Sequence, residues 1–293
     1  MSDHNRMGMW WLTHLYFFAR LINGKPVAFS SQLHDWRVNI WRVNIWRVNI
    51  WRVNMPRLAA GSSQERNEAV STVAFLARSR LTFILINYFQ ESESLNNRSD
   101  LLTAINPLYD DVEDIFEQWK IDEWLESCRG GDINGWILGE LVLSGYTSIL
   151  FMLRKASSVP EMTDRRSMLS ENNGMIPRSD LSMRTSRRIL KLVHHMIYIL
   201  KLPGPEAMSL ILGNYRAYIA HAHLASGLMQ EPTAPTTEDD LLLLWDVAKC
   251  IEGLAREVNE FVPLARAFMM VNDEVRRRVQ GNHEAIERLV EAF

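Results

Sequence analysis

Apolar residues recur along this chain at the spacing of helices. The segment from Met7 to Ile22 is apolar nearly all round, which predicts a buried helix. Gly24 and Pro26 follow it closely and should end it, because glycine caps a helix and proline cannot continue one. A second helix is predicted from Ala69 to Phe89. Strand patterns are scarce outside residues 36–55, so the fold class is predicted to be all-α.

The middle of the chain carries a clear helix signal. Asn106 and Pro107 resemble an N-cap followed by proline at the first helical position. The residues after this pair follow the spacing of one helix face: Leu108, Val112, Ile115, Phe116 and Trp119. The sequence therefore predicts a helix that starts at this proline.

Further helices are predicted in the second half, after Gly130 and Gly131. The predicted ranges are Trp136–Arg154, Leu181–Leu200, Pro205–Met229 and Thr237–Val271, with Glu274–Phe293 as a terminal helix or tail. Pro263 should kink or split the fourth of these. Residues 155–180 are rich in Ser, Asn, Pro and charge, and we expect them to form a mobile loop. Residues 1–293 are thus predicted to form one irregular domain of about eight helices.

Residues 36–55 are four near-identical copies of Trp-Arg-Val-Asn-Ile, the last of which ends in Met55. Interleaved Trp and Arg side chains could stack on bases and hold phosphates. A period of five builds no single face, however, because each copy turns its Trp by about 140° on a helix and to the other side on a strand. We interpret this pentapeptide repeat as a low-complexity insertion produced by slippage of a short DNA tract.

Composition narrows the classes of function. The chain has 32 basic and 35 acidic residues, a net charge of −3, whereas nucleic-acid binders usually show a basic excess. Its two cysteines, Cys128 and Cys250, cannot build a disulfide framework or a four-cysteine metal site. No uninterrupted apolar run reaches the roughly 18 residues that a membrane span needs, so no membrane contact is expected.

One acidic motif suggests an enzyme. Residues Asp110 to Asp114 fit the pattern D-D-x-x-D, which binds magnesium and a substrate diphosphate in class I terpene synthases. The aspartates lie roughly 85° to 175° from the centre of the apolar stripe, so we expect them to face solvent. The second metal motif would fall at 272–280, where Arg276 and Gln280 replace the required Ser and Glu. A terpene synthase-like enzyme with magnesium therefore stays the alternative hypothesis.

The histidine pairs give a weak metal signal. Zinc ligands on a helix prefer i, i+4 spacing, whereas His194 and His195 are adjacent and His221 and His223 are two apart. We expect these four to be partly buried or surface residues. No catalytic residue, cofactor-binding residue or metal ligand is predicted.

Several motifs together resemble a known family. Trp10 and Trp11 are followed by Gly24-Lys25-Pro26 and, with the repeat reduced to one copy, by a short acidic segment ending in Met55-Pro56. This order resembles the middle homology region of fungal zinc-cluster transcription factors. Trp119 is similar to the tryptophan of the family's "L-x-x-W" helix. Three later segments resemble its following helices: Leu141–Arg154, Arg184–Leu200 and Leu241–Phe268.

The resemblance implies a regulatory domain, not an enzyme, that controls RNA polymerase II transcription of metabolic genes in the nucleus. The implied partners are co-regulators or the transcriptional machinery and a small-molecule inducer, and a homodimer stays open. The family's zinc cluster, its contact with DNA, is absent from this chain, so no cofactor is expected here. We expect a truncated gene model or a degenerate paralogue. Trp10, Trp11, Gly24, Pro26 and Trp119 are expected to have structural roles.

The repeat interpretation predicts that three copies are dispensable. Deleting residues 36–50 should preserve helical circular dichroism and hold or raise the melting temperature, because loop closure costs grow only with the logarithm of length. The deletion also removes Trp and Ile side chains that we expect to be exposed, and it should therefore improve solubility. A fall in melting temperature of more than about 10 °C would show that the repeat belongs to the core.

Overall fold

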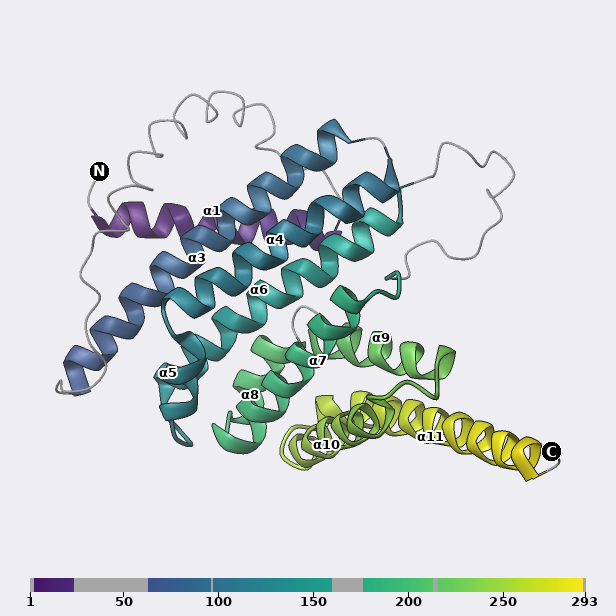
Figure 1. Cartoon of the computed structure of the whole chain (residues 1–293). Coiled ribbons are helices and arrows are strands. Elements are labelled where there is room, and N and C mark those ends of the chain that lie inside the picture. Colours follow the sequence, from purple (N-terminus) through teal and green to yellow (C-terminus); the bar gives the residue numbers. More distant parts are fainter. Residues whose placement is uncertain (1–2, 24–62, 96, 160–175, 213–215, 292–293) are drawn as a thin grey trace.

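The computed structural model describes residues 3–23, 63–95, 97–159, 176–212 and 216–291. Over these ranges the chain forms helices and no strand, which confirms the all-α prediction (Figure 1). The α-helices are α1 (Asp3–Asn23), α3 (Ser63–Ser94), α4 (Arg98–Gln118), α5 (Ile121–Ser127), α6 (Ile133–Ser157), α7 (Asp180–His194), α8 (Gly204–Ala207), α9 (Arg216–Gln230), α10 (Thr237–Ala255) and α11 (Val262–Glu291). Two π-helical turns, η2 (His195–Ile199) and η3 (Met208–Leu212), and one 3₁₀ turn, η4 (Asn259–Phe261), complete these elements. Both α5 and α8 are short, and the other eight α-helices of the described ranges agree with the prediction of about eight.

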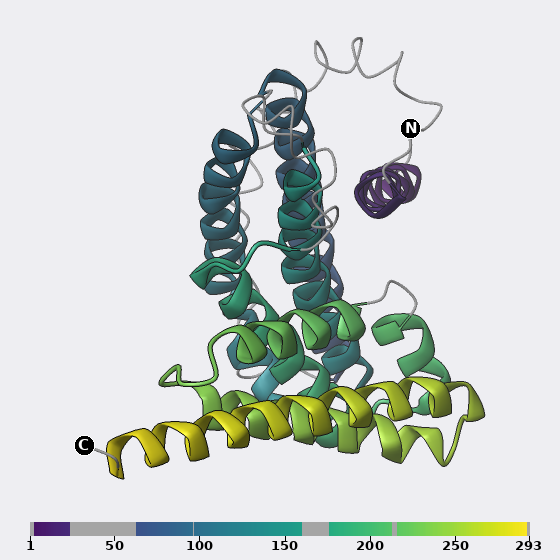
Figure 2. The ribbon, with the colours of Figure 1, turned by 90° about the vertical axis from the view of Figure 1, so that its right-hand side faces the viewer.

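The helices form two groups that cross. Helices α3, α4 and α6 run side by side, and α1 crosses them (Figure 1). Helices α9, α10 and α11 lie across one end of this bundle (Figure 2). Helix α7 joins the groups, because it packs against α6 on one side and against α9 and α10 on the other.

Helix α6 is the central element of the core. The Asp132 side chain caps its start by accepting a hydrogen bond from the Asn134 amide, and nearly every residue from Leu138 to Ala156 is buried. The helix contacts α1, α3, α4, α5, α7 and α9. A helix that is apolar all round is typical of such a position, because it has neighbours on every side.

Among the described residues, two helices are long and apolar enough to cross a membrane by length and composition alone. They are residues Arg66–Ser94 of α3 and the whole of α6. Each is apolar on average over a long window, although a few polar residues interrupt its apolar runs. In α6, 83% of the apolar window is buried inside the protein, and in α3 the share is 61%. This burial is what core helices show, so the feature is weak evidence for a membrane contact.

Helix α4 begins earlier than predicted. Asn97 is its N-cap and accepts a hydrogen bond from the Ser99 amide, whereas Pro107 lies inside the helix. The prediction of a start at Asn106-Pro107 is therefore wrong. Leu101 and Ile105, both buried, extend the apolar stripe ahead of the proline, and their packing offsets the one hydrogen bond that the proline removes.

Helix α1 is amphipathic rather than buried all round. Phe17, Phe18 and Leu21 are buried, but 66% of Leu12 and 43% of Leu15 are exposed. The described neighbours of α1 are α3 and α6, and they cover one side of the helix. The prediction of a helix that is buried all round is therefore wrong for the face that carries Leu12 and Leu15.

The helices of the C-terminal half can be compared with the ranges predicted from the sequence. Pro263 lies in the first turn of α11, so the predicted split of Thr237–Val271 is confirmed, with α10 before it and η4 between them. The predicted helix Pro205–Met229 is divided into α8, η3 and α9. Residues beyond Glu274, predicted as a terminal helix or tail, continue α11 as far as Glu291.

The predicted loop at 155–180 is shorter than its bounds, since α6 continues to Ser157 and α7 begins at Asp180 after its N-cap Ser179. Residues 160–175 of that loop lie outside the described residues. The repeat at 36–55 also lies outside them, so its prediction stays untested.

Close packing of α4 on α6 gives a stability prediction. A Cβ added at Gly145 would lie 2.7 Å from Cζ of Phe116 and 3.2 Å from Cγ1 of Val112. Gly145→Ala should therefore lower the free energy of unfolding by about 1–3 kcal/mol in urea denaturation. The matched control is Gly253→Ala in α10, where a Cβ meets nothing within 4 Å. The control should raise stability by up to about 1 kcal/mol through helix propensity; equal effects of the two substitutions would contradict the packing described here.

Candidate functional site

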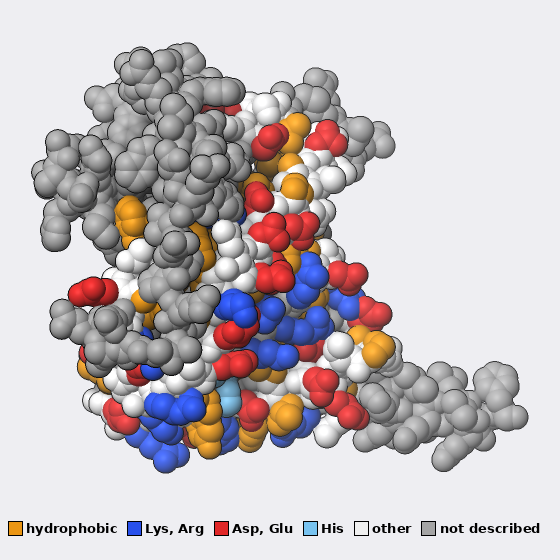
Figure 3. Space-filling model, turned by 60° about the vertical axis from the view of Figure 1, so that its left-hand side comes forward, with side chains coloured by type: hydrophobic (Ala, Val, Ile, Leu, Met, Phe, Trp, Pro, Cys, Tyr) orange, Lys and Arg blue, Asp and Glu red, His pale blue; other side chains and the backbone are white. Residues whose placement is uncertain are grey.

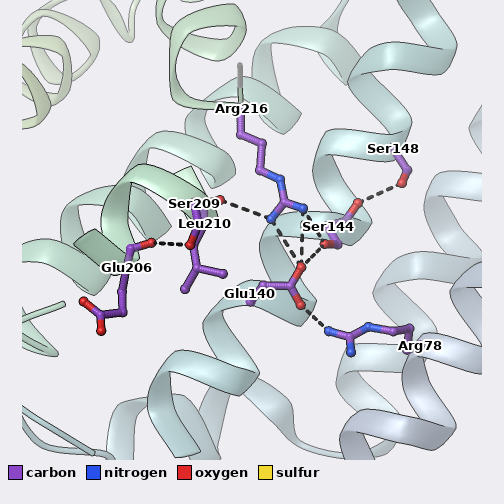
Figure 4. Close-up of polar contacts among 8 residues, drawn as sticks. All are labelled: Arg78, Glu140, Ser144, Ser148, Glu206, Ser209, Leu210 and Arg216. Atoms are coloured by element: carbon purple, nitrogen blue, oxygen red, sulfur yellow. Dashed lines mark hydrogen bonds and ion pairs between the residues drawn. The ribbon is translucent and has the colours of Figure 1, made fainter. Parts of the chain in front are cut away.

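A largely buried ionic cluster joins the two groups of helices. Its centre is the carboxylate of Glu140 on α6, whose side chain is 16% exposed. Arg78 from α3 donates to Glu140 Oε2, and Arg216 from α9 lies 3.4 Å from Oε1 (Figure 4). The side chains of Arg78 and Arg216 are 18% and 5% exposed. One carboxylate thus connects three helices that are far apart in sequence.

Hydrogen bonds with two further groups hold the Glu140 carboxylate and the Arg216 guanidinium in place. Ser144, one turn after Glu140 on α6, donates its hydroxyl to Glu140 Oε1 at 2.7 Å and accepts from Arg216 Nη2 at 3.0 Å. Arg216 Nη1 also donates to the carbonyl of Leu210 at 3.3 Å. Figure 4 shows the two guanidinium groups approaching Glu140 from opposite sides. The arrangement orients both arginines as well as the carboxylate.

The charges in the cluster hold each other ionised. Burial by itself would raise the pKa of Glu140, but Arg78, Arg216 and the Ser144 hydroxyl together hold that pKa below its ordinary value. Burial lowers the pKa of Arg216, and Glu140 opposes that effect. A carboxylate with a lowered pKa is a poor general acid or base near neutral pH. The cluster is therefore suited to fixing charges and helices in place rather than to proton transfer.

His14 of α1 lies beside this cluster as a neutral ring. Burial, followed by the charge of Arg78, lowers its pKa from 6.5 to about 4. Its Nδ1 atom is 3.1 Å from the Thr82 hydroxyl, which itself donates to the carbonyl of Arg78. Because that hydroxyl proton is already used, His14 Nδ1 is the donor to Thr82. The cluster therefore extends from α1 through α3 and α6 to α9.

A second polar cluster lies between α4, α6 and α7. Glu113 on α4 accepts hydrogen bonds from the hydroxyls of Tyr109 and, at 3.1 Å, of Tyr146 on α6. Arg188 on α7 is 3.6 Å from the Glu113 carboxylate, and the guanidinium of Arg184 lies 4.5 Å from the centre of the Tyr109 ring. Burial is the main cause that raises the pKa of both tyrosines, so both stay protonated. This cluster also joins helices, here by a shared carboxylate acceptor.

Of the five predicted signature positions, the structure describes the side chain of Trp119 alone. Trp10 and Trp11 lie on α1, where the structure describes the backbone but not these side chains, and Gly24 and Pro26 lie outside the described residues. Trp119 ends α4 and is buried, with the guanidinium of Arg80 at 5.5 Å from its ring centre. A structural role for Trp119 agrees with this packing.

The acidic motif on α4 faces outward as its register predicts. Asp110, Asp111 and Asp114 are exposed, while Val112 between them is buried. At the place of the second metal motif, Asn272 is buried and donates to the Leu244 carbonyl at 2.9 Å. Within the described ranges, no group of three His, Cys, Asp or Glu side chains is placed to hold a metal ion. Nothing in this geometry favours magnesium binding by the motif.

Two of the four histidines correct an expectation from the sequence. His221 and His223 are buried rather than partly exposed. His221 stacks on Phe268 of α11 with ring centres 3.9 Å apart, and His223 Nε2 lies 2.9 Å from the Ser182 hydroxyl of α7. Burial is the main cause that lowers the pKa of each to about 4, so both are neutral core residues.

The sequence analysis missed Glu140, Arg78, Arg216 and His14. A signal was present for Glu140, because it is the only charged residue between Ile133 and Leu153. A single carboxylate within a buried helix requires partners. Nothing local identifies those partners, which lie 62 and 76 residues away.

Comparisons with known proteins add no family to this picture. A scan against protein-family models and searches of curated proteins and of solved structures found no match. Function therefore has to be inferred from the residues themselves.

The cluster predicts a large effect of one neutral substitution. Glu140→Gln removes the charge that Arg78 and Arg216 share, and should lower the free energy of unfolding by about 3–5 kcal/mol at neutral pH. Because the folded pKa of Glu140 lies below its ordinary 4.5, this contribution is present above pH 4.5 and is lost as the pH falls below it. The difference between wild type and variant should therefore shrink in acid.

The matched control is Glu123→Gln, which removes an exposed carboxylate paired with Lys120. That change should alter stability by less than about 0.5 kcal/mol. Urea titrations followed by circular dichroism measure both variants. A Glu140→Gln effect no larger than that of the control would contradict the role given to this carboxylate.

Proposed function

We propose that this chain is the regulatory domain of a fungal zinc-cluster transcription factor and acts in the nucleus on RNA polymerase II transcription of metabolic genes. In this proposal the zinc cluster that binds DNA belongs to a module outside the chain, and the domain works by contact with co-regulators or a small-molecule inducer. The observation that carries the proposal is the ordered series of family-like motifs, from Trp10-Trp11 through Trp119 to the last helices.

The placement of these motifs supports the proposal. Trp119 stands at the junction of α4 and α5, and the segment Leu141–Arg154 lies wholly within α6. The segment Arg184–Leu200 covers most of α7 with η2, and Leu241–Phe268 runs from α10 into α11. Each of these four motifs thus falls on a helix or a helix junction.

The character of the polar groups also supports binding over catalysis. Glu140 and Glu113 are held by arginine and hydroxyl partners, and the three aspartates of the D-D-x-x-D motif are exposed. On the face drawn in Figure 3, basic side chains gather near the middle and acidic side chains border them on several sides. Such a surface suits protein partners better than the phosphate backbone of DNA.

A reporter experiment tests the proposal. The chain is fused to an unrelated DNA-binding domain and expressed in a fungal host with a reporter that carries the matching site. We expect a several-fold change in transcription, up or down, relative to the DNA-binding domain alone, because the fused module replaces the missing zinc cluster. The chain without the fusion should have no effect and should show no sequence-selective, salt-resistant binding to CGG-type sites in fluorescence anisotropy.

Two matched controls make the result clear. A fusion carrying Gly145→Leu, which should disrupt packing against Phe116, tests whether the effect needs the folded domain. A fusion carrying Glu123→Gln at an exposed position should behave as wild type. A soluble, folded fusion that leaves transcription of the reporter unchanged would contradict the proposal.

A further inference from the structure

The start of α6 and the end of α7 carry a group of exposed apolar side chains. Ile133 is the first residue of α6, and Tyr198 and Ile199 belong to the π-helical turn η2. Their side chains are 58%, 57% and 44% exposed, and they are three of the eight large hydrophobic residues that are exposed in the described ranges. Single apolar side chains on a surface are ordinary, but a group of them marks an interaction site. We call these three residues, with the partly buried Trp136, the η2 patch.

Hydrogen bonds hold the two parts of the η2 patch together. The Leu200 carbonyl, directly after Ile199, accepts from the Gly131 amide at 2.9 Å and from Trp136 Nε1 at 3.2 Å. Ile133 lies three residues before Trp136, and therefore on the same face of α6. The two segments meet at the end of the bundle that α5 marks in Figure 1. Residues that are more than sixty positions apart in the sequence are thus fixed side by side.

The backbone that presents Tyr198 and Ile199 is irregular. The Leu200 amide donates to the carbonyl of His195, five residues earlier, which closes the π-helical turn. Lys201 follows with a φ of 53°, a left-handed conformation that is costly for a residue with a Cβ. Such turns and strained residues gather at functional sites, because surrounding contacts must hold them in place. The shape of the patch is therefore fixed before any partner binds, which lowers the entropic cost of binding.

Two cations border the η2 patch, and neither has a carboxylate partner in the described part of the chain. The ammonium of Lys201 lies 4.8 Å from the centre of the Tyr198 ring, and its side chain packs closely on Gly130. Arg129, the neighbour of Gly130, is exposed and donates to two backbone carbonyls. An apolar surface with a cationic border is complementary to an apolar surface with an acidic border.

The carboxylates nearest to these cations in the sequence have other neighbours. Asp132 caps the start of α6 and lies 3.8 Å from the guanidinium of Arg66. Glu126 lies near His195, because burial lowers the pKa of that ring and the charge of Glu126 opposes this effect. The border of the patch is therefore positively charged, although the whole chain has a net charge of −3.

We propose that the η2 patch binds an acidic amphipathic helix of a partner protein, with the apolar side chains of that helix on the patch and its carboxylates beside Arg129 and Lys201. A helix presents apolar side chains at intervals of three and four residues, with charged positions next to them, and this arrangement fits a compact apolar surface with cations at its border. The described ranges hold no strand, so they offer no sheet edge to which an extended peptide could add. The proposal goes beyond the regulatory role proposed above and does not rest on it, since it concerns binding by the isolated chain.

Charge speaks against two other occupants of the patch. In a two-fold dimer the same surface meets itself, so Arg129 and Lys201 would approach the same cations of the second copy. Helices that lie on anionic membranes carry basic residues along the whole length of an apolar face. Here two cations border three exposed apolar side chains on a chain whose net charge is negative.

Fluorescence anisotropy of the full chain with labelled peptides tests the proposal. The probes are helical peptides of about 16 residues with Leu or Phe at intervals of three and four and Glu elsewhere, and the charge controls are the same peptides with Lys in place of Glu. We expect Glu peptides to bind with a dissociation constant in the micromolar range that rises with salt concentration. The Lys peptides should bind at least about tenfold more weakly.

An apolar variant places this binding on the η2 patch. Ile133→Ser combined with Ile199→Ser removes two exposed contacts and should weaken binding of the Glu peptides by at least about tenfold. The matched control, Leu242→Ser, changes an exposed leucine of α10 and should leave the dissociation constant within about twofold of wild type. Both positions of the apolar variant are exposed, so circular dichroism should show it to be as helical as wild type.

A charge-reversal variant tests the border of the patch. Arg129→Glu combined with Lys201→Glu should reverse the preference, so that Lys peptides bind more tightly than Glu peptides. The matched control is Lys120→Glu combined with Arg266→Glu, which makes the same change of net charge at exposed positions outside the patch. Lys120 also shares the left-handed backbone conformation of Lys201. This control should keep the preference for Glu peptides.

Several results would overturn the proposal. They are a chain that binds no Glu peptide up to about 1 mM, equal binding of Glu and Lys peptides, and binding that either patch variant leaves unchanged. Sedimentation velocity and flotation with phosphatidylserine vesicles test the other occupants. Self-association or vesicle binding that Ile133→Ser with Ile199→Ser abolishes would assign the patch to a second copy or to a membrane instead.

Discussion

One largely buried carboxylate, Glu140, holds three helices of this protein together. Glu140 lies on the most buried helix, α6, and a charge in that environment is costly unless it is paired and hydrogen-bonded. Arg78 and Arg216 supply the opposite charges from α3 and α9, and Ser144 completes the set from α6 itself. Only a limited range of positions of α3 and α9 against α6 satisfies all these contacts. The upright bundle and the helices that cross its end are thereby held in one relation.

Small residues on α6 let its neighbours approach closely enough to use that constraint. A Cβ at Gly139 would lie 2.9 Å from the sulfur of Met196, and one at Gly145 would lie 2.7 Å from Phe116. Helix α4 and the turn η2 that follows α7 can therefore pack directly on α6. Glu113 joins α4, α6 and α7 through Tyr146 and Arg188. A rigid scaffold of this kind can present surface helices to partners in a fixed orientation, as the proposed regulatory role requires.

Sequence patterns predicted the features that depend on local spacing and missed those that depend on distant contacts. The all-α class and the break at Pro263 follow from helical periodicity and from the geometry of proline, and both are confirmed. The start of α4 was misplaced because a local signal at Asn106-Pro107 competed with a stripe that begins at Leu101. His221 is buried by Phe268 of another helix, and no residue near it in sequence indicates this. Of the candidate site, Glu140 alone carried a local signal, since its arginine partners are more than sixty residues away.

A double-mutant cycle between Glu140 and Arg216 tests most directly whether this contact fixes the fold. Free energies of unfolding are measured for Glu140→Gln, Arg216→Met and the two combined, all at neutral pH. If the ion pair couples α6 to α9, the double variant should be less destabilised than the sum of the single variants by about 2 kcal/mol. Additivity within about 0.5 kcal/mol would mean that the two side chains do not act together, and would contradict the account.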